Sequence, residues 1–175
     1  IFTKFLLITK RNNMKKIVLI RHAKSSWDNS GLDDYERPLN PRGMKDAPAM
    51  SNILTEKIQK PDLIITSSAV RALTTANFIA SAFNYPEESI IKDKTIYLAS
   101  RQKVLEIVSK IDSKNDLIFL VGHNPTITEL ASFLSNTKID NLPTCASVGI
   151  EFDTNKWENI SKSNSKLIFF EYPKK

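Results

Sequence analysis

The sequence has very few of the residues that usually build disulfides and metal centres. It contains one cysteine and two histidines among 175 residues. The single cysteine, Cys145, cannot form a disulfide within the chain, and together with two histidines it cannot supply a conventional zinc site. We therefore expect a protein that needs no metal or other cofactor, and its cysteine usage is typical of the reducing cytoplasm.

Long apolar runs are also missing. No stretch approaches the roughly 18 apolar residues of a membrane-spanning helix, so we expect no membrane association. The stretch FLLI (5–8) is too short for the apolar part of a secretion signal, and no small-residue cleavage site follows it. Since MKKIVLIRH starts at residue 14, we interpret residues 1–13 as a disordered leader or upstream extension and 14–175 as a single domain.

Acidic residues are absent from the first 16 positions, and this affects how the net charge of +6 is interpreted. Seven of the 25 basic residues lie at the two ends of the chain, and the other 18 nearly balance the 19 acidic residues. A nucleic-acid-binding domain gathers its basic residues on one face or along one helix. The distribution therefore argues against a nucleic-acid partner, and binding through the basic ends remains a minor alternative.

The sequence does contain short apolar runs that alternate with amphipathic segments. Continuous apolar runs predict strands covered on both faces at 16–20, 62–66 and 116–121, and two further strands are predicted at 146–152 and 166–172. Apolar residues at helical spacing predict helices at 44–58, 69–83, 101–111 and 125–135. Pro48 disfavours the first turns of the first helix, whereas Asn124 and Pro125 suit the cap and first position of the last. This order predicts an α/β fold, a three-layer sandwich with a mostly parallel central sheet and helices on both faces.

Both histidines directly follow predicted buried strands. Arg21 and His22 follow the first strand, His123 follows the third, and Arg71 lies in the first turn of the helix after the second. The carboxyl ends of parallel strands share one edge of a sheet, where such folds bind ligands. Several cationic groups at one edge repel one another unless an anion binds, and guanidinium forks beside helix N-termini suit phosphate. From these residues alone, a phosphate site and separate structural roles remain alternatives.

Three motifs in the same order resemble those of one enzyme family. RHAKSSWD (21–28) resembles the signature of the histidine phosphatase superfamily, with Ala23 in place of the usual glycine. SSAVRALTTA (67–76) resembles its second-arginine motif, and VGHNP (121–125) resembles its second-histidine motif. RPLNPRG (37–43) resembles the first loop of the short SixA-type phosphohistidine phosphatases. The resemblance implies a phosphoglycerate-mutase-like fold.

The resemblance also implies roles for these residues. His22 would attack phosphorus and become phosphorylated before water releases phosphate, while Arg21, Arg71 and His123 would bind the phosphoryl oxygens. Neighbouring arginines should lower the pKa of His22 and keep it neutral.

Two further residues are candidates for substrate binding. Arg37 would either touch the substrate at the rim of the pocket or pair with Asp33, Asp34 or Glu36. Ser25 would either donate to phosphate or serve as a turn residue.

The sequence departs from the mutase-like pattern in the acid that protonates the leaving group. Mutase-like relatives carry a glutamate between the second arginine and the second histidine, but TIYLASRQ (95–102) contains no acid. A phosphoramidate depends less on such an acid than an alkyl ester does. The departure favours phosphohistidine on a partner protein, such as a histidine phosphotransfer domain, although Asp28 remains an alternative acid.

Two other functions are compatible with the same motifs. One is a small-molecule phosphatase that acts on sugar phosphates or other esters. The other is a non-catalytic phosphate-binding module, which would keep Arg21 and Arg71 but would not need His22 as a nucleophile.

Overall fold

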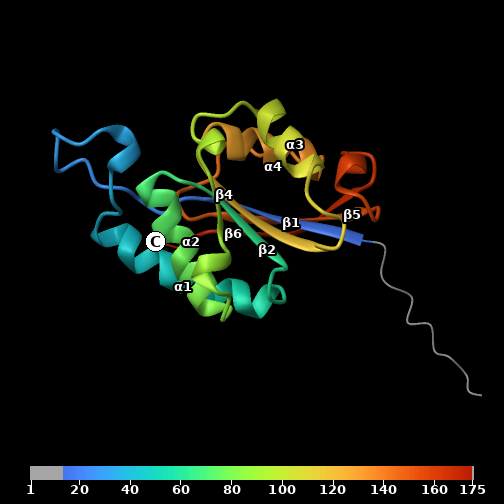
Figure 1. The fold of residues 1–175 in the computed structure, drawn as a ribbon, viewed down its shortest axis with the longest axis horizontal. Coiled ribbons are helices and arrows are strands. Elements are labelled where there is room, and N and C mark those ends of the chain that lie inside the picture. The colour runs from blue at the N-terminus through green and yellow to red at the C-terminus, as the bar shows by residue number, and fades with distance from the viewer. Residues whose placement is uncertain (1–13, 175) are drawn as a thin grey trace, which may run out of the picture.

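The computed structural model describes residues 14–174, so the predicted leader or extension at 1–13 lies outside the described residues (Figure 1). Strands and helices alternate along the chain, joined by loops and short 3₁₀ turns. They are β1 (Met14–Arg21), α1 (Pro41–Lys57), β2 (Leu63–Ser67), α2 (Val70–Ala82), β3 (Ile91–Asp93), α3 (Arg101–Ser109), β4 (Leu117–Gly122), α4 (Thr126–Ser135), β5 (Ser147–Asp153) and β6 (Ser165–Glu171). The predicted strands and helices are all present to within a few residues, and the short strand β3 is an addition.

The strands form one sheet in the order β3-β2-β4-β1-β5-β6. Strands β3, β2, β4 and β1 pair in parallel, whereas β5 runs antiparallel to both β1 and β6. The predicted, mostly parallel sheet is therefore confirmed.

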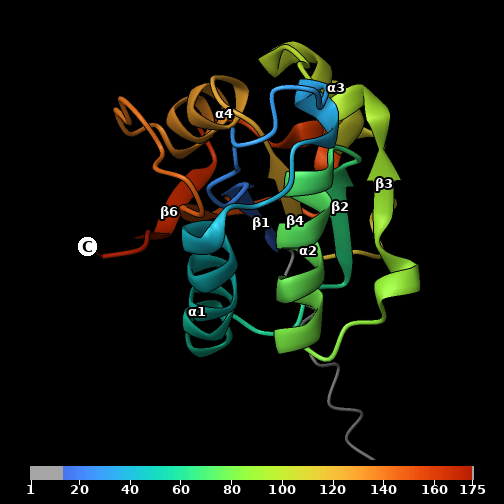
Figure 2. The same ribbon diagram turned by 90° about the vertical axis from the view of Figure 1, so that its left-hand side faces the viewer.

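The helices cover both faces of this sheet, with α1 and α2 on one face and α3 and α4 on the other (Figures 1 and 2). The reason is visible in β1, whose successive side chains point to opposite faces. Ile17 and Leu19 belong to the core beneath α3 and α4, whereas Val18 and Ile20 belong to the core beneath α2. Every one of these four side chains is almost fully buried. The three-layer sandwich is therefore also confirmed.

The first helix starts earlier than expected. Helix α1 begins at Pro41, where a proline is well tolerated, and the Asn40 side chain caps it by accepting from the Gly43 amide at 2.9 Å. Pro48 lies inside the helix without ending it.

The start of α4 differs from the expectation that Asn124 caps it and Pro125 is its first residue. The helix begins at Thr126 with Pro125 in the capping position, and the Asn124–Pro125 peptide bond is cis. The Asn124 amide instead donates to the carbonyl of Leu142, at 3.2 Å, and accepts from the Thr128 hydroxyl. Asn124 therefore ties α4 to the segment before β5.

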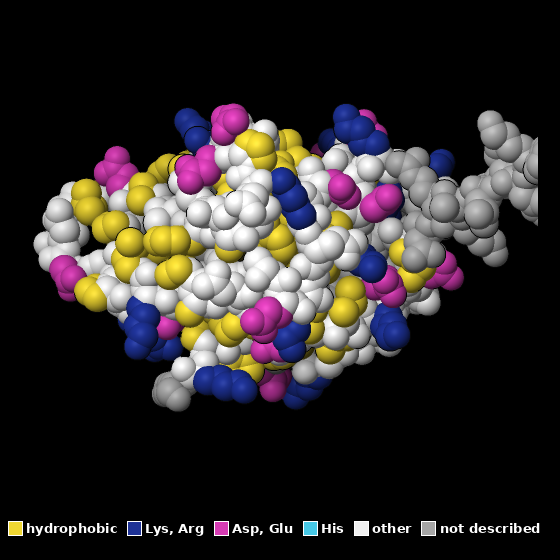
Figure 3. All heavy atoms as spheres, turned by 90° about the horizontal axis from the view of Figure 1, so that it is seen from below, with side chains coloured by type: hydrophobic (Ala, Val, Ile, Leu, Met, Phe, Trp, Pro, Cys, Tyr) yellow, Lys and Arg dark blue, Asp and Glu magenta, His cyan; other side chains and the backbone are white. Residues whose placement is uncertain are grey.

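Two sequence-based expectations concern the distribution of charge and the absence of a membrane-spanning helix. On the α1 and α2 side of the described chain, basic and acidic side chains are interspersed (Figure 3). Within residues 14–174, none of the helices combines the length and the apolar character that crossing a bilayer requires.

The parallel strands end together at one edge of the sheet. Arg21 at the end of β1 pairs in register with Gly122 at the end of β4. The next amide, that of His22, donates to the Gly122 carbonyl at 3.1 Å. His22 and His123 therefore leave neighbouring strands side by side.

Candidate active site

The two histidines lie next to each other in a buried site at this edge. Their ring centroids are 5.0 Å apart, and the residues are 8% and 7% exposed. The Nδ1 atom of His22 is 2.7 Å from the carbonyl oxygen of Ala23. Because a carbonyl can only accept a hydrogen bond, Nδ1 must carry the hydrogen, and Nε2 of the neutral ring keeps its lone pair. Nε2 of His22 therefore has a lone pair that can accept a hydrogen bond or attack an electrophile.

Arg71 faces this nitrogen from the first turn of α2. Its Nε lies 3.3 Å from Nε2 of His22, and the arginine is only 6% exposed. Both terminal nitrogens contact Asp34: Nη1 donates to the backbone carbonyl, and Nη2 is 2.7 Å from a carboxylate oxygen, Oδ2. The Asp34 ion pair thus holds a buried arginine against His22.

Two buried nitrogens at the site, one on His123 and one on Arg21, have no hydrogen-bond partner among the described residues. Nε2 of His123 contacts the Ser67 hydroxyl at 2.8 Å, but its Nδ1 is buried with no hydrogen-bond partner among the described residues. Arg21 donates from Nη1 to the carbonyl of Leu142 at 2.6 Å, and its buried Nε is likewise unpartnered within residues 14–174. Buried polar groups nearly always have partners, so these two nitrogens indicate a ligand site, and the Nε–H of Arg21 requires an acceptor there.

Burial keeps both imidazoles neutral. Burial is the largest cause that lowers the pKa of His22 to about 3 and that of His123 to about 4. For His22, the hydrogen bond to Ala23 acts in the opposite direction, and electrostatic interactions with His123, Arg71 and Arg21 lower its pKa further. The lowered pKa of His22 matches the sequence-based expectation, but burial away from water lowers it more than the neighbouring arginines do.

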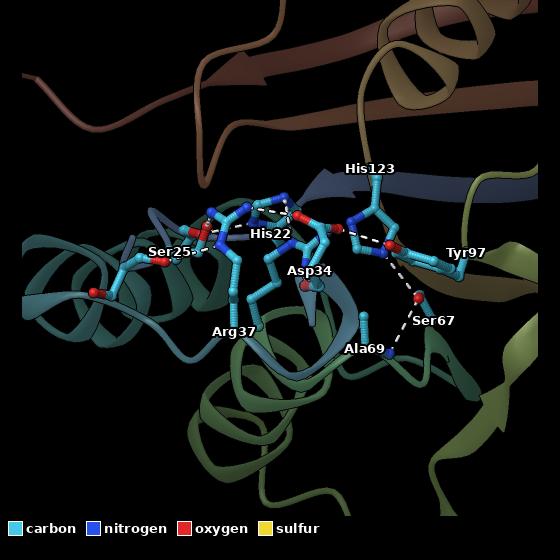
Figure 4. A network of polar contacts seen from close by, with 11 residues as sticks. His22, Ser25, Asp34, Arg37, Ser67, Ala69, Tyr97 and His123 are labelled. Carbon is cyan, nitrogen blue, oxygen red and sulfur yellow. Dashed lines mark hydrogen bonds and ion pairs between the residues drawn. The ribbon is translucent and has the colours of Figure 1, made fainter. Parts of the chain in front are cut away.

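Arg37 and Ser25 lie in the loop between β1 and α1 and contact each other there (Figure 4). Nε of Arg37 donates to the carbonyl of Ser26 at 2.8 Å, Nη1 pairs with Asp34 at 2.6 Å, and Nη2 donates to the Ser25 hydroxyl. The Trp27 ring covers the same guanidinium. All three nitrogens are committed to the chain itself, so this geometry favours pairing with Asp34 over contact with substrate.

The central position of Asp34 in the site was not predicted from the sequence. Its carboxylate binds Arg37, Arg71 and the hydroxyl of Tyr97, the last at 2.7 Å. Partial burial alone would raise its pKa, but hydrogen bonds from Tyr97, Arg71 and Arg37 lower the pKa to about 2. Nothing in the sequence singled out the contacts with Arg71 and Tyr97, because a pairing with Arg37 three residues away was the only local signal.

Asp28, the alternative acid, lies elsewhere on the same loop. Its carboxylate accepts from the Ser26 hydroxyl at 2.7 Å on the exposed part of the segment. Its position is therefore set by Ser26, and not by the arginines.

The backbone of Cys145 contacts the end of β1. Its amide is 3.1 Å from the carbonyls of both Arg21 and His22. Burial raises the pKa of its thiol to about 12, so the sulfur is a poor nucleophile. Its contribution here is a backbone contact that fixes the end of β1.

Comparison with known proteins identifies the family. The sequence profile of the histidine phosphatase superfamily (branch 1) matches residues 17–96. An uncharacterised chloroplastic protein of Arabidopsis thaliana is 31% identical over 152 residues, which cover 82% of this chain and 69% of the relative. The chain belongs to the histidine phosphatase superfamily. Of the superfamily residues discussed above, Arg21, His22 and Arg71 lie within the matched range, whereas His123 lies beyond it.

Solved structures share this superfamily fold. A structure assigned as the phosphohistidine phosphatase SixA of Agrobacterium tumefaciens superposes with a TM-score of 0.77 at 24% identity, covering 91% of this chain and 99% of the other. The protein histidine phosphatase SixA complexed with tungstate gives a TM-score of 0.73 at 17% identity, covering 90% and 96%. The phosphoglycerate-mutase-like fold expected from the motifs is confirmed.

Proposed function

We propose that this chain is a phosphatase that hydrolyses its substrate through a phosphohistidine formed on His22. One observation carries the proposal. Nε2 of His22 has a lone pair because Nδ1 donates to Ala23, and the buried guanidinium of Arg71 lies 3.3 Å away. A neutral imidazole beside a fixed cation is the arrangement that attack on an anionic phosphoryl group requires.

The reaction has two steps, and the same groups serve both. Nε2 of His22 forms a bond to phosphorus as the bond to the leaving group breaks, and the leaving group takes up a proton from solvent. Water then attacks phosphorus, the bond to Nε2 breaks, and the water proton leaves with phosphate or solvent. The free imidazole is restored, so the enzyme is unchanged after each turnover.

The unpartnered donors would bind the phosphoryl oxygens. Nε of Arg21 is available, and Nδ1 of His123 carries a hydrogen when the Ser67 hydroxyl donates to Nε2. With Arg71 these groups supply positive charge and hydrogen bonds around the transferring group, so catalysis by positioning and electrostatics needs no metal. Ser25 and Arg37 would act indirectly, by holding the loop that carries Asp34.

The substrate that we propose is phosphohistidine on a partner protein, such as a histidine phosphotransfer domain. The carboxylate closest to the arginines is that of Asp34, and its pKa of about 2 leaves it without a proton near pH 7. An imidazole leaving group needs less help from an acid than the alkoxide of a sugar phosphate does. The single buried cysteine is compatible with action in a reducing cytoplasm.

A substrate panel tests both the proposed phosphatase activity and the proposed phosphohistidine substrate. We would measure kcat/KM for a phosphohistidine protein, phosphoserine and phosphotyrosine peptides, and sugar phosphates, with His22→Asn as the inactive control. The proposal predicts the highest kcat/KM on phosphohistidine and no turnover by His22→Asn.

The alternatives predict different results. An equal or higher kcat/KM on sugar phosphates would refute the substrate assignment and support a small-molecule phosphatase. Tight phosphate binding without turnover of any substrate would refute catalysis and support a phosphate-binding module.

A further inference from the structure

The contact between Asp34 and Arg71 joins two distant parts of the chain at the reacting nitrogen. Asp34 lies in the 3₁₀ turn Asp34–Glu36 of the loop between β1 and α1, whereas Arg71 belongs to α2. Asp34 contributes two acceptors to the same guanidinium, its backbone carbonyl and its carboxylate. Of the described residues, only Asp34 and His22 accept hydrogen bonds from the Arg71 side chain.

This double contact fixes the direction in which Arg71 points. A guanidinium is rigid and planar, so holding both terminal nitrogens also sets the direction of Nε–H. With Nη1 and Nη2 held by Asp34, Nε faces Nε2 of His22 at 3.3 Å. If the Asp34 side chain is removed, the Asp34 backbone carbonyl still accepts from Nη1, but Nη2 loses its partner. A guanidinium held at only one terminal nitrogen is less firmly fixed in this orientation.

Asp34 is itself held on two sides (Figure 4). Its Oδ1 pairs with Arg37 at 2.6 Å, and its Oδ2 accepts from Tyr97 at 2.7 Å. Arg37 is anchored by Ser25 and Ser26. A continuous set of polar contacts therefore runs from the loop to the nucleophile.

The charge of Asp34 also matters. Arg21 and Arg71 act on the two neutral imidazoles, Arg37 lies in the neighbouring loop, and the Asp34 carboxylate pairs with Arg37 and Arg71. A net charge close to +2 then remains, which matches a phosphoryl dianion.

We propose that Asp34 is a positioning residue, which aims Arg71 at the phosphoryl group bound or bonded to Nε2 of His22. This role rests on the proposed function of His22 as the nucleophile. Asp34 acts through Arg71, and it neither donates a proton nor occupies the phosphoryl site.

A double-mutant cycle tests this role, because two residues that act through one interaction are not additive. Loss of one donor to a transition state costs on the order of 10²–10³ in rate, so a misdirected Arg71 in Asp34→Ala should lower kcat by about 10- to 100-fold. In the Arg71→Ala background, the same substitution should lower kcat by less than about threefold. Asp33→Ala is the matched control, since Asp33 is the exposed neighbour and its side chain does not cap the turn.

Two further measurements separate positioning from the other roles of a carboxylate. Positioning predicts that Asp34→Ala lowers kcat equally for phosphohistidine and for p-nitrophenyl phosphate, which has a good leaving group. A loss confined to substrates with poor leaving groups, persisting in the Arg71→Ala background, would overturn the proposal in favour of a proton donor. Equal losses in both backgrounds together with a lower Tm would overturn it in favour of a general structural role.

Tungstate binding, measured by calorimetry, tests the same role without turnover. Asp34→Ala should weaken tungstate binding several-fold in the wild-type background and leave it unchanged in the Arg71→Ala background. Tighter binding by Asp34→Ala would overturn the proposal, because Asp34 would then be a competitor for Arg71. Failure of the wild type to hydrolyse any substrate would reject the proposed function, whereas the tungstate cycle would still report on Asp34.

Discussion

Acidification should destabilise the folded protein through its two buried histidines. Both are neutral in the folded state, with pKa values of about 3 for His22 and about 4 for His123, and the chain has no other histidine. In the unfolded chain, histidine titrates near a pKa of about 6.5. The unfolded state therefore binds protons that the folded state rejects, and the free energy of unfolding falls as the pH drops from about 6.5 towards 4.

The size of this effect follows from the direction of the two shifts. When only the unfolded state is protonated, each histidine contributes a slope of about 1.4 kcal/mol per pH unit. Between pH 7 and pH 5, each histidine should lower the free energy of unfolding by about 2 kcal/mol, and the two together by about 4 kcal/mol. Asp34 titrates below this range, since its pKa is about 2.

Urea unfolding at pH 7, 6 and 5 measures this dependence. His22→Asn and His123→Asn should each remove about half of the pH dependence, and the double variant should remove nearly all of it. The reasoning would be refuted by a wild type whose stability does not change over this range, or by a double variant that retains the wild-type slope.

Three other substitutions or treatments have defined outcomes. In Gly43→Ala, the added Cβ would lie 2.1 Å from the backbone oxygen of Lys24, so the free energy of unfolding in urea should fall by about 1–3 kcal/mol. Gly31→Ala, whose nearest neighbour is a side-chain oxygen at 3.3 Å, should be close to neutral, and equal stability of the two variants would contradict this packing. Arg71→Lys keeps the charge but loses the planar fork, so kcat/KM should fall by at least about tenfold; an unchanged value would show that charge alone suffices. Dialysis against EDTA should leave kcat/KM unchanged, and a loss restored by one divalent cation would contradict catalysis without a metal.

The proximity of the charged and imidazole groups at the strand ends could be predicted from the sequence. Arg21, His22 and His123 directly follow buried strands, and Arg71 follows a third, so their proximity is a consequence of parallel pairing. Continuous apolar runs indicate strands that are buried inside the sheet, and apolar residues at helical spacing indicate helices that cover it. The same patterns explain why the three-layer architecture was predicted correctly.

The loop between β1 and α1 was not predictable to the same degree. Asp34 meets Arg71 and Tyr97 across 37 and 63 residues, and the loop has no periodicity that reports such contacts. The sequence therefore predicted Asp34 only as a possible local partner of Arg37, and its contacts with Arg71 and Tyr97 were missed. The short strand β3 was not predicted for a related reason. Three residues at a sheet edge show too little alternation between apolar and polar side chains to be recognised as a strand.

The start of α4 was predicted wrongly because capping preferences are local and the deciding contacts are not. Asn124 has the side chain of a typical cap, but it bonds Leu142 and Thr128 instead. Pro125 then takes the capping position. Tertiary contacts outweighed the local preference at this position.

Rapid-quench labelling of His22 tests most directly whether the buried cluster transfers phosphoryl groups. The protein would be mixed for milliseconds with a labelled phosphoryl donor and quenched in alkali, in which phosphohistidine is stable. We predict a label that is lost in acid, maps to the peptide containing His22, forms at least as fast as turnover, and is missing from His22→Asn. A label that persists in His22→Asn, or a wild type that turns over without acquiring any label, would contradict the role assigned to this histidine.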